Sequence, residues 1–408
     1  MSTAIPAEFR PYDPAFAADP YPVYARLRER TPIFQAPEMR MTLVTRYDDI
    51  RSLLLDGRLA RTMDHVTPPE ELERQRLAWA RLPNYSRYVR VNLLEMEGAD
   101  HARLRRLVST ALNPWRIRAL RSRIQSLVDE MLGALEPRGS MNFLEDLAVP
   151  LPVYMISELL GWPGEERHRL RPWSARIVRL YEKDYTADDE THAEAAAGEF
   201  AAMLGELADR RRAEPRDDLI SALVAVVDDG ERLSRDELIA TCMLLLNAGH
   251  EATVNAAGNG LLALLRHPQQ LARLRAIPSL ITTAVEEMIR YDAPLQLFHR
   301  FVLEDLEFAG IRFAKGERVG LLYGSGNRDR RAFERADEFD VGRQPNRHLG
   351  FGTGNHFCLG APLARLELEI LFATLLQRLP QLQLEDGEPE YRTGLVFRGL
   401  KELRLRWR

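Results

Sequence analysis

The chain of 408 residues contains only two cysteines, Cys242 and Cys358. Two thiols are too few for a disulfide-stabilised scaffold or for a zinc site built from cysteines. They leave room for one thiolate with a special role. The chain also lacks a charge bias, because 56 basic residues face 60 acidic ones and the formal net charge is −4. A basic surface for nucleic acid is therefore not predicted.

Long apolar runs are absent as well. No stretch approaches the roughly 18 apolar residues of a membrane span, and residues 1–13 contain no apolar segment of signal-peptide length. We therefore expect a cytoplasmic protein without a membrane span. A strand–GxGxxG–helix unit and a P-loop are also missing, so nothing favours a doubly wound nucleotide-binding sheet.

Helical periodicity fills most of the chain. The longest helix is expected from an N-cap at Ser234 to about Arg266, which corresponds to roughly 50 Å. Two further strong helices are predicted over 281–291 and from about 362 to 379. Residues 59–97 resemble a long functional loop. The fold class is therefore mainly α with a minor β region, expected mainly within 31–60 and 295–325.

The segment 351–360, FGTGNHFCLG, carries the strongest functional signal. Its three glycines allow the backbone to approach a flat ligand closely. Cys358 lies just before a predicted helix with Pro362 in its first turn, where free N–H groups and the helix dipole favour a thiolate. A thiolate held in this way is a candidate iron ligand. A buried structural cysteine is the usual alternative for an isolated cysteine before a helix, and the ten-residue pattern argues against it.

This segment resembles the haem-binding loop of the cytochromes P-450. Other motifs of that family occur in the family's order between residues 101 and 367, and we expect the resemblance to cover the whole chain. They are His101–Arg106 for the haem-side helix, Ala248–Glu251 for the oxygen-side helix, Glu287–Arg290 for the Glu-x-x-Arg helix, and Asn327–Asp329, Phe339, Asp340 and Arg343 for the coil before the loop.

The resemblance implies a cytochrome P-450 fold of the soluble bacterial class I type. Residues 1–408 would form a single α-rich triangular prism, with haem b between the long oxygen-side helix and the helix after the cysteine loop. Cys358 would be the axial ligand of the iron. The positions that match propionate-binding residues of the family are His101, Arg105, Arg300 and His356, with His348 as a further candidate.

The Glu-x-x-Arg match implies a buried network of Glu287, Arg290 and Arg343 that braces the coil before the loop. An isolated Glu and Arg three residues apart would otherwise indicate an exposed ion pair worth a few tenths of a kcal/mol. If the network is buried, single replacements should be severe.

The oxygen-side helix departs from the family pattern. Where the family usually has threonine after the acid, this chain has Ala252 after Glu251, and Thr253 lies about 100° further round the helix. Two interpretations remain open: ordered water and Glu251 deliver protons, or a substrate hydroxyl or carbonyl replaces the missing hydroxyl, as in some macrolide-hydroxylating relatives. Glu251, Ala252 and Thr253 are the predicted catalytic residues. The predicted substrate pocket includes Ala248, Leu295 and Leu297.

The resemblance implies a monooxygenase that inserts one oxygen atom from O2 into a small organic substrate by hydroxylation or epoxidation. The Ala252 departure suggests a polyketide or macrolide of secondary metabolism. Oxidative phenol coupling, peroxide-driven chemistry and a non-catalytic haem sensor are the alternatives. Because the chain lacks flavin and iron–sulfur motifs, electrons are expected from a ferredoxin and its reductase. Cationic residues that could dock such a partner are Arg103, Arg106, Arg116, Arg118 and Arg365.

Overall fold

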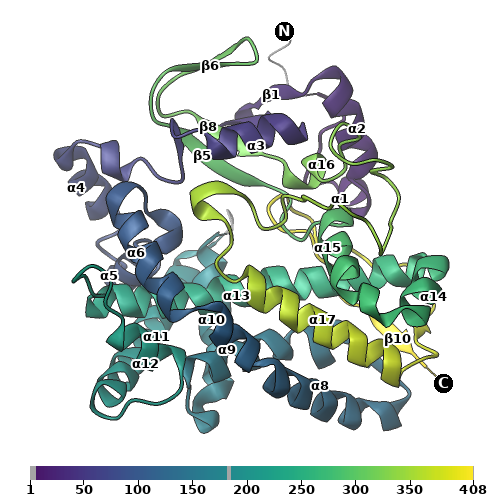
Figure 1. Cartoon of the computed structure of the whole chain (residues 1–408). Coiled ribbons are helices and arrows are strands. Elements are labelled where there is room, and N and C mark those ends of the chain that lie inside the picture. Colours follow the sequence, from purple (N-terminus) through teal and green to yellow (C-terminus); the bar gives the residue numbers. More distant parts are fainter. Residues whose placement is uncertain (1–5, 182–184, 408) are drawn as a thin grey trace. The chain divides into compact units, whose positions relative to one another are not determined.

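The computed structural model describes residues 6–181 and 185–407 (Figure 1). Its contacts divide the chain into two compact units. Unit 1 comprises Met1–Ala60, Arg121–Leu151 and Ala252–Arg408, and unit 2 comprises Arg61–Leu120 and Pro152–Glu251. The expectation of a single domain over 1–408 concerns how these units combine, and it stays a prediction.

Unit 2 is helical. Its centre is α11 (Ala187–Ala213), which begins with a capping box between Thr186 and Asp189 and packs against α5, α10 and α12. Trp162, Trp173 and Phe200 form an aromatic cluster in its core. The other helices are α4 (Pro69–Leu77), α5 (Pro83–Tyr88), α6 (Gly98–Ala111), α7 (Pro114–Ala119), most of α9 (Pro150–Leu160), α10 (Leu170–Val178) and α12 (Leu219–Ala225).

The long loop expected over 59–97 is only partly a loop. It contains α4 and α5, each with proline in its first turn. Proline at that position costs no hydrogen bond, because the first N–H groups of a helix have no partner within the helix.

Unit 1 contains the β structure. A five-stranded sheet has the order β1-β2-β8-β5-β3, in which β2 and β8 run parallel and the other pairs antiparallel. Unit 1 also contains two smaller sheets, the hairpin β6-β7 and the three-stranded sheet β4-β10-β9. The strands are β1 (Ile33–Ala36), β2 (Met41–Val44), β3 (Leu59–Ala60), β4 (Ser140–Asn142), β5 (Phe298–Val302), β6 (Leu306–Phe308), β7 (Ile311–Phe313), β8 (Arg318–Leu321), β9 (Gln383–Leu384) and β10 (Arg404–Arg406).

The helices of unit 1 carry the cysteine loop and its supports. In Figure 1, α17 (Ala361–Arg378) follows the loop, and it packs against α8 (Arg121–Leu135) and α15 (Ile281–Tyr291). The other helices are α1 (Pro14–Ala18), α2 (Tyr21–Arg30), α3 (Tyr47–Leu55), α14 (Pro268–Ala276) and α16 (Tyr323–Gly326).

The longest helix, α13 (Arg235–Arg266), contributes residues to both units. It begins as predicted after Ser234, where Glu237 N–H donates to the Ser234 hydroxyl at 3.2 Å and Ser234 N–H donates to the Glu237 carboxylate at 2.7 Å. This reciprocal pair satisfies two N–H groups at the helix start. The prediction of a mainly helical chain with minor β structure is confirmed. In the described parts of the chain, no helix is both long enough and apolar enough for a membrane span.

Candidate functional site

The cysteine loop, residues 351–360, turns the chain into α17. The Cys358 N–H donates to the Phe351 carbonyl at 2.9 Å, which fixes the backbone at the cysteine. Gly352 and Gly354 have φ of +67° and +74°, a conformation that side chains strain. A Cβ on Gly354 would also lie 3.0 Å from the carbonyl oxygen of Leu54. Two of the three glycines are therefore required by the turn itself.

The two cysteines have opposite environments. Cys242 is fully buried, and burial raises the pKa of its thiol to about 12, so it stays a neutral thiol at physiological pH. Cys358 is partly exposed and lies three residues before α17, a helix of 18 residues. Helix N-termini stabilise thiolates. Of the two sulfur atoms, that of Cys358 is the one suited to bind a metal as an anion.

Behind the loop lies a group of charged residues that we call the loop network: Glu286, His348 and Arg365. Arg365 donates to both oxygens of Glu286, at 2.6 and 2.9 Å, and His348 Nε2 lies 3.1 Å from the same carboxylate. Partial burial alone would raise the pKa of Glu286, but the hydrogen bonds from His348 and Arg365 and the charge of Arg365 outweigh it and lower that pKa to about 2. Glu286 is therefore ionised.

His348 has a different place from the one the resemblance suggested. Its Nδ1 accepts from the Gly350 N–H at 3.1 Å, which assigns the ring proton to Nε2, facing Glu286. The structure thus pairs His348 with a carboxylate of the protein itself. Its candidacy as a propionate ligand receives no support.

A second group, which we call the core network, contains Glu287, Arg290 and Arg343. Arg290 donates to both oxygens of Glu287 at 2.7 and 2.8 Å, and Arg343 Nε donates to the same carboxylate at 3.0 Å. Arg290 also donates to the carbonyls of Asn327 and Ala336, both at 2.8 Å. The three residues that the sequence grouped are brought together, and they are buried.

The cationic candidates for propionates are divided between the units. In unit 1, Arg300 is buried on β5, with its guanidinium 5.2 Å from the centre of the Phe298 ring, and His356 ends the short turn Gly354–His356. In unit 2, His101 and Arg105 lie four residues apart on α6 and so share one face of that helix. A sulfur at a helix N-terminus and a buried guanidinium within one unit suit an iron porphyrin with carboxylate side chains.

The residues predicted for oxygen chemistry lie along α13. Ala248 is exposed, Glu251 and Ala252 are half-buried, and Thr253 is buried. The accessible side of the helix at this point therefore carries a carboxylate and small side chains. The Thr253 side chain lies on the buried side, as its position one residue beyond Ala252 predicts.

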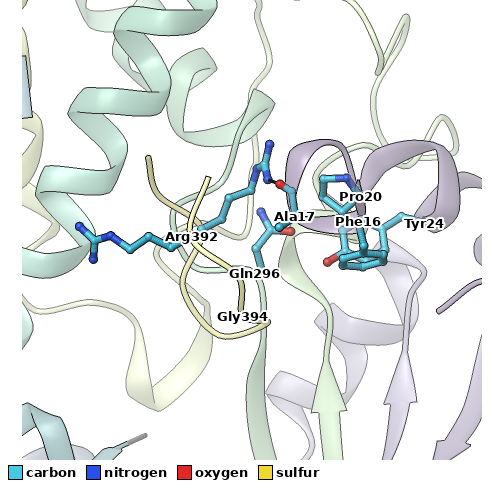
Figure 2. A pocket seen from close by; sticks show the side chains of 8 residues that line it. Phe16, Ala17, Pro20, Tyr24, Gln296, Arg392 and Gly394 are labelled. Carbon is cyan, nitrogen blue, oxygen red and sulfur yellow. Dashed lines mark hydrogen bonds between the residues drawn. The ribbon is translucent and has the colours of Figure 1, made fainter. Parts of the chain in front are cut away.

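The predicted pocket residue Leu297 requires a correction. It is 4% exposed and belongs to an apolar core with Phe16 and Tyr24. Leu295 is only partly buried and packs against a separate core cluster. Gln296, between them, lines a small cavity, and none of the predicted site residues lines that cavity (Figure 2).

The ion pair between Glu286 and Arg365 was not predicted from the sequence. Glu286 lies beside the motif residue Glu287 and was given no role, and the docking role of Arg365 stays a prediction. Another unanticipated cluster surrounds Asp292, which accepts hydrogen bonds from Tyr21, Tyr391 and Arg398 at 2.6, 2.8 and 2.6 Å. These partners lie up to 271 residues from Asp292 in the chain, so local patterns carry no signal for them.

Comparison with known proteins identifies close relatives. Residues 174–276 and 279–401 match the model of the family described as Cytochrome P450. The chain is 40% identical to "Cytochrome P450 monooxygenase PikC" of Streptomyces venezuelae over 96% of this chain and 92% of that protein. It is 37% identical to "6-deoxyerythronolide B hydroxylase" of Saccharopolyspora erythraea, over 96% and 97%. The solved structure of "Bacillus subtilis 168 Bacillaene Polyketide Synthase (PKS) Cytochrome P450 PksS" has a TM-score of 0.88 at 35% identity and covers 98% of this chain and 99% of that chain.

Proposed function

The chain belongs to the cytochrome P450 family of oxidoreductases, and on this basis we propose that it is a haem-thiolate monooxygenase that oxidises a polyketide or macrolide. Family membership implies a haem with a cysteine thiolate as axial ligand. The observation that carries the proposal is the setting of Cys358 at the start of α17, within the sequence FGTGNHFCLG.

Haem b, held through its iron by Cys358, would activate O2 and transfer one of its oxygen atoms to the substrate. The chain's own residues prepare the site for it. The N-terminus of α17 favours the anionic sulfur, and the loop glycines let the backbone approach the ring. Arg300 and His356 would bind propionates. The same role for His101 and Arg105 stays a prediction from their match to the family.

Proton delivery would depend on the α13 residues. Glu251 is half-buried and carries a carboxylate that can exchange protons with water, while Ala252 offers no hydroxyl. Thr253 lies on the buried side of the helix, which supports the interpretation that a polar group of the substrate, rather than a protein hydroxyl, holds the water. Ala252→Thr is then expected to disturb turnover of the native substrate, because the added side chain occupies the place of that group.

The electron donor is proposed to be a ferredoxin with its reductase, which would place the reaction in the cytoplasm. The cations available for docking are fewer than the sequence suggested. Arg103 pairs with Glu237, Arg106 with Asp228 and Arg116 with Asp217. Arg118 is exposed, has no ion pair among the described residues, and lies three residues after the exposed Trp115. Arg118→Glu is therefore expected to slow reduction by ferredoxin more than Arg106→Glu does.

The first experiment tests the ligand. The full chain is produced with haem, and the ferrous-carbonyl spectra of wild type, Cys358→Ser and Cys242→Ser are compared. The serine variant at 358 should lose the thiolate spectrum, whereas the matched variant at 242 should keep it. A thiolate spectrum that survives in Cys358→Ser would refute the assignment.

The second experiment tests the reaction. Polyketide lactones are screened for a spin-state change of the haem, and compounds that bind are incubated with ferredoxin, its reductase and ¹⁸O2. A product with one labelled oxygen supports the proposal. Coupled phenols, turnover with peroxide alone, or binding without turnover would support the corresponding alternative. The substrate class is suggested by the names of the relatives and by Ala252.

A further inference from the structure

We propose that Arg365 and Glu286 are positioning residues for the cysteine loop: they clamp Phe351, and through it the backbone at Cys358, between α15 and α17. This inference rests on the proposed function, since it concerns how the sulfur is presented to iron. It assigns Arg365 a role different from docking an electron-transfer partner.

The first step is the orientation of Arg365. Its Nε and one terminal nitrogen both donate to Glu286, so the planar guanidinium is fixed in a bidentate pair. The carbon at the centre of this fixed plane lies 4.5 Å from the centre of the Phe351 ring. A guanidinium held over an aromatic face is a favourable contact. Glu286 thus determines where Arg365 meets the loop.

The second step is the position of Phe351. Its ring contacts His348, with centroids 5.8 Å apart, and Phe357, with centroids 6.4 Å apart in an edge arrangement. Its carbonyl accepts the N–H of Cys358 at 2.9 Å. Arg365 and His348 thus both contact the Phe351 ring, and the Phe351 carbonyl fixes the N–H of Cys358, which carries the sulfur.

The third step concerns charge. The hydrogen bond to Glu286 is the main cause that raises the pKa of Arg365, and the charge of Cys358 adds to it. The guanidinium and the sulfur therefore attract each other. Because the Arg365 side chain is only 32% exposed, this attraction is screened less than it would be at a free surface. Removing the cation should destabilise the more negative, reduced state of the site.

The test compares four variants as haem-loaded full-length protein. Arg365→Gln removes both the positive charge and the planar guanidinium, whereas Arg365→Lys keeps the charge and loses the bidentate geometry. Glu286→Gln removes the carboxylate that holds Arg365 in place. Arg378→Gln is the matched control, because Arg378 lies on the same helix, is 26% exposed and pairs with Glu136 and Asp129. The readouts are haem transfer to apomyoglobin, the reduction potential, and the conversion of the ferrous-carbonyl thiolate band to its inactive form.

Arg365→Gln is expected to release haem about tenfold faster, from the loss of charge-assisted hydrogen bonds, and to lower the reduction potential. Arg365→Lys should release haem faster than wild type at a nearly normal potential, and Glu286→Gln should give an intermediate rate. Arg378→Gln should match wild type. If Arg365→Gln yields no haem-loaded protein, the lysine variant and Glu286→Gln carry the test.

Two other outcomes separate this inference from the proposed function. If haem release and potential are unchanged in Arg365→Gln and only the salt dependence of reduction by ferredoxin changes, Arg365 is a docking residue and the inference is overturned. If wild type itself shows no thiolate spectrum, the proposed function fails.

Discussion

Glu286 and Glu287 are neighbours on α15, yet they serve different parts of the molecule. The Glu287 side chain is 0% exposed and is surrounded by Arg290 and Arg343, whereas that of Glu286 is 21% exposed and meets Arg365 and His348. Consecutive helical residues point about 100° apart, so one carboxylate faces the coil that contains Arg343 and the other faces the cysteine loop and α17.

The difference lies in what surrounds each carboxylate. In the core network the two guanidinium groups have further hydrogen bonds, because Arg290 and Arg343 also donate to backbone carbonyls of the coil at 334–338. A buried pair of this kind is costly to break, since the remaining partner is left as an unpaired charge. The loop network is partly exposed to solvent, and its Arg365 contacts the aromatic ring of Phe351. We infer that the core network holds the fold of the coil, while the loop network adjusts the site.

Glu287→Gln should have the largest effect. The substitution keeps the shape but leaves two buried guanidinium groups without a counter-charge, so we expect a loss of about 3 to 5 kcal/mol in the free energy of unfolding. Denaturant unfolding of the haem-loaded protein measures it. Glu286→Gln on the same helix is the variant for comparison, and its loss should be smaller, because its carboxylate is partly exposed. Equal losses in the two variants would contradict the comparison.

Glu286→Gln should show its effect through pH. The pKa of Glu286 is about 2 in the folded protein against an ordinary 4.5, so the unfolded chain binds its proton at higher pH. The carboxylate therefore stabilises the fold above about pH 4.5, and this contribution is lost as pH falls toward 2. At 1.36 kcal/mol per pKa unit, the difference between 4.5 and about 2 amounts to roughly 3 kcal/mol.

The measurement is the difference in unfolding free energy between wild type and Glu286→Gln at a series of pH values from 7 down to the acid limit of the fold. The difference should be constant near neutrality and shrink below about pH 4.5. A difference that does not change with pH would mean that the loss comes from packing rather than from charge.

The contrast also shows which parts of the site the sequence can reveal. The spacing of Glu287 and Arg290 is local, and the helix Ile281–Tyr291 was predicted with its observed ends. The roles of Glu286 and Arg365 depend on residues 62 to 79 positions apart in the chain, which only the folded arrangement brings together. Leu297 was misplaced for a related reason, because its core partners Phe16 and Tyr24 lie far from it in the chain. Helix α4 was missed because none of its residues is buried, so its sequence has no apolar stripe.

A third carboxyl, Glu367 on α17, sharpens the comparison because it has no ion pair among the described residues. Glu367 is buried, and burial raises its pKa to about 8. The folded state therefore holds a proton that the unfolded chain releases near pH 4.5, and stability falls as pH rises from about 4.5 to 8. Glu367→Gln should be nearly neutral at pH 5 and stabilising by up to a few kcal/mol above pH 8. If wild type and variant change in parallel from pH 5 to 8, the side chain is ionised and partnered in the fold.

The smallest effect is expected where a buried polar group has no partner to lose. Tyr24 and Tyr21 both lie on α2, but the Tyr21 hydroxyl donates to Asp292 at 2.6 Å, whereas the Tyr24 hydroxyl has no hydrogen-bond partner among the described residues. Tyr24 lines the small cavity of Figure 2. Tyr24→Phe should therefore change the unfolding free energy by less than about 0.5 kcal/mol, while Tyr21→Phe should cost about 1.5 to 3 kcal/mol, because it leaves the buried carboxylate without one donor. Thermal unfolding of both variants measures this. If Tyr24→Phe costs as much unfolding free energy as Tyr21→Phe, an ordered water in the cavity must give the Tyr24 hydroxyl a hydrogen-bond partner. Hydrogen-bond partners rather than burial would then determine the cost at both tyrosines, as they do for the two carboxylates of α15.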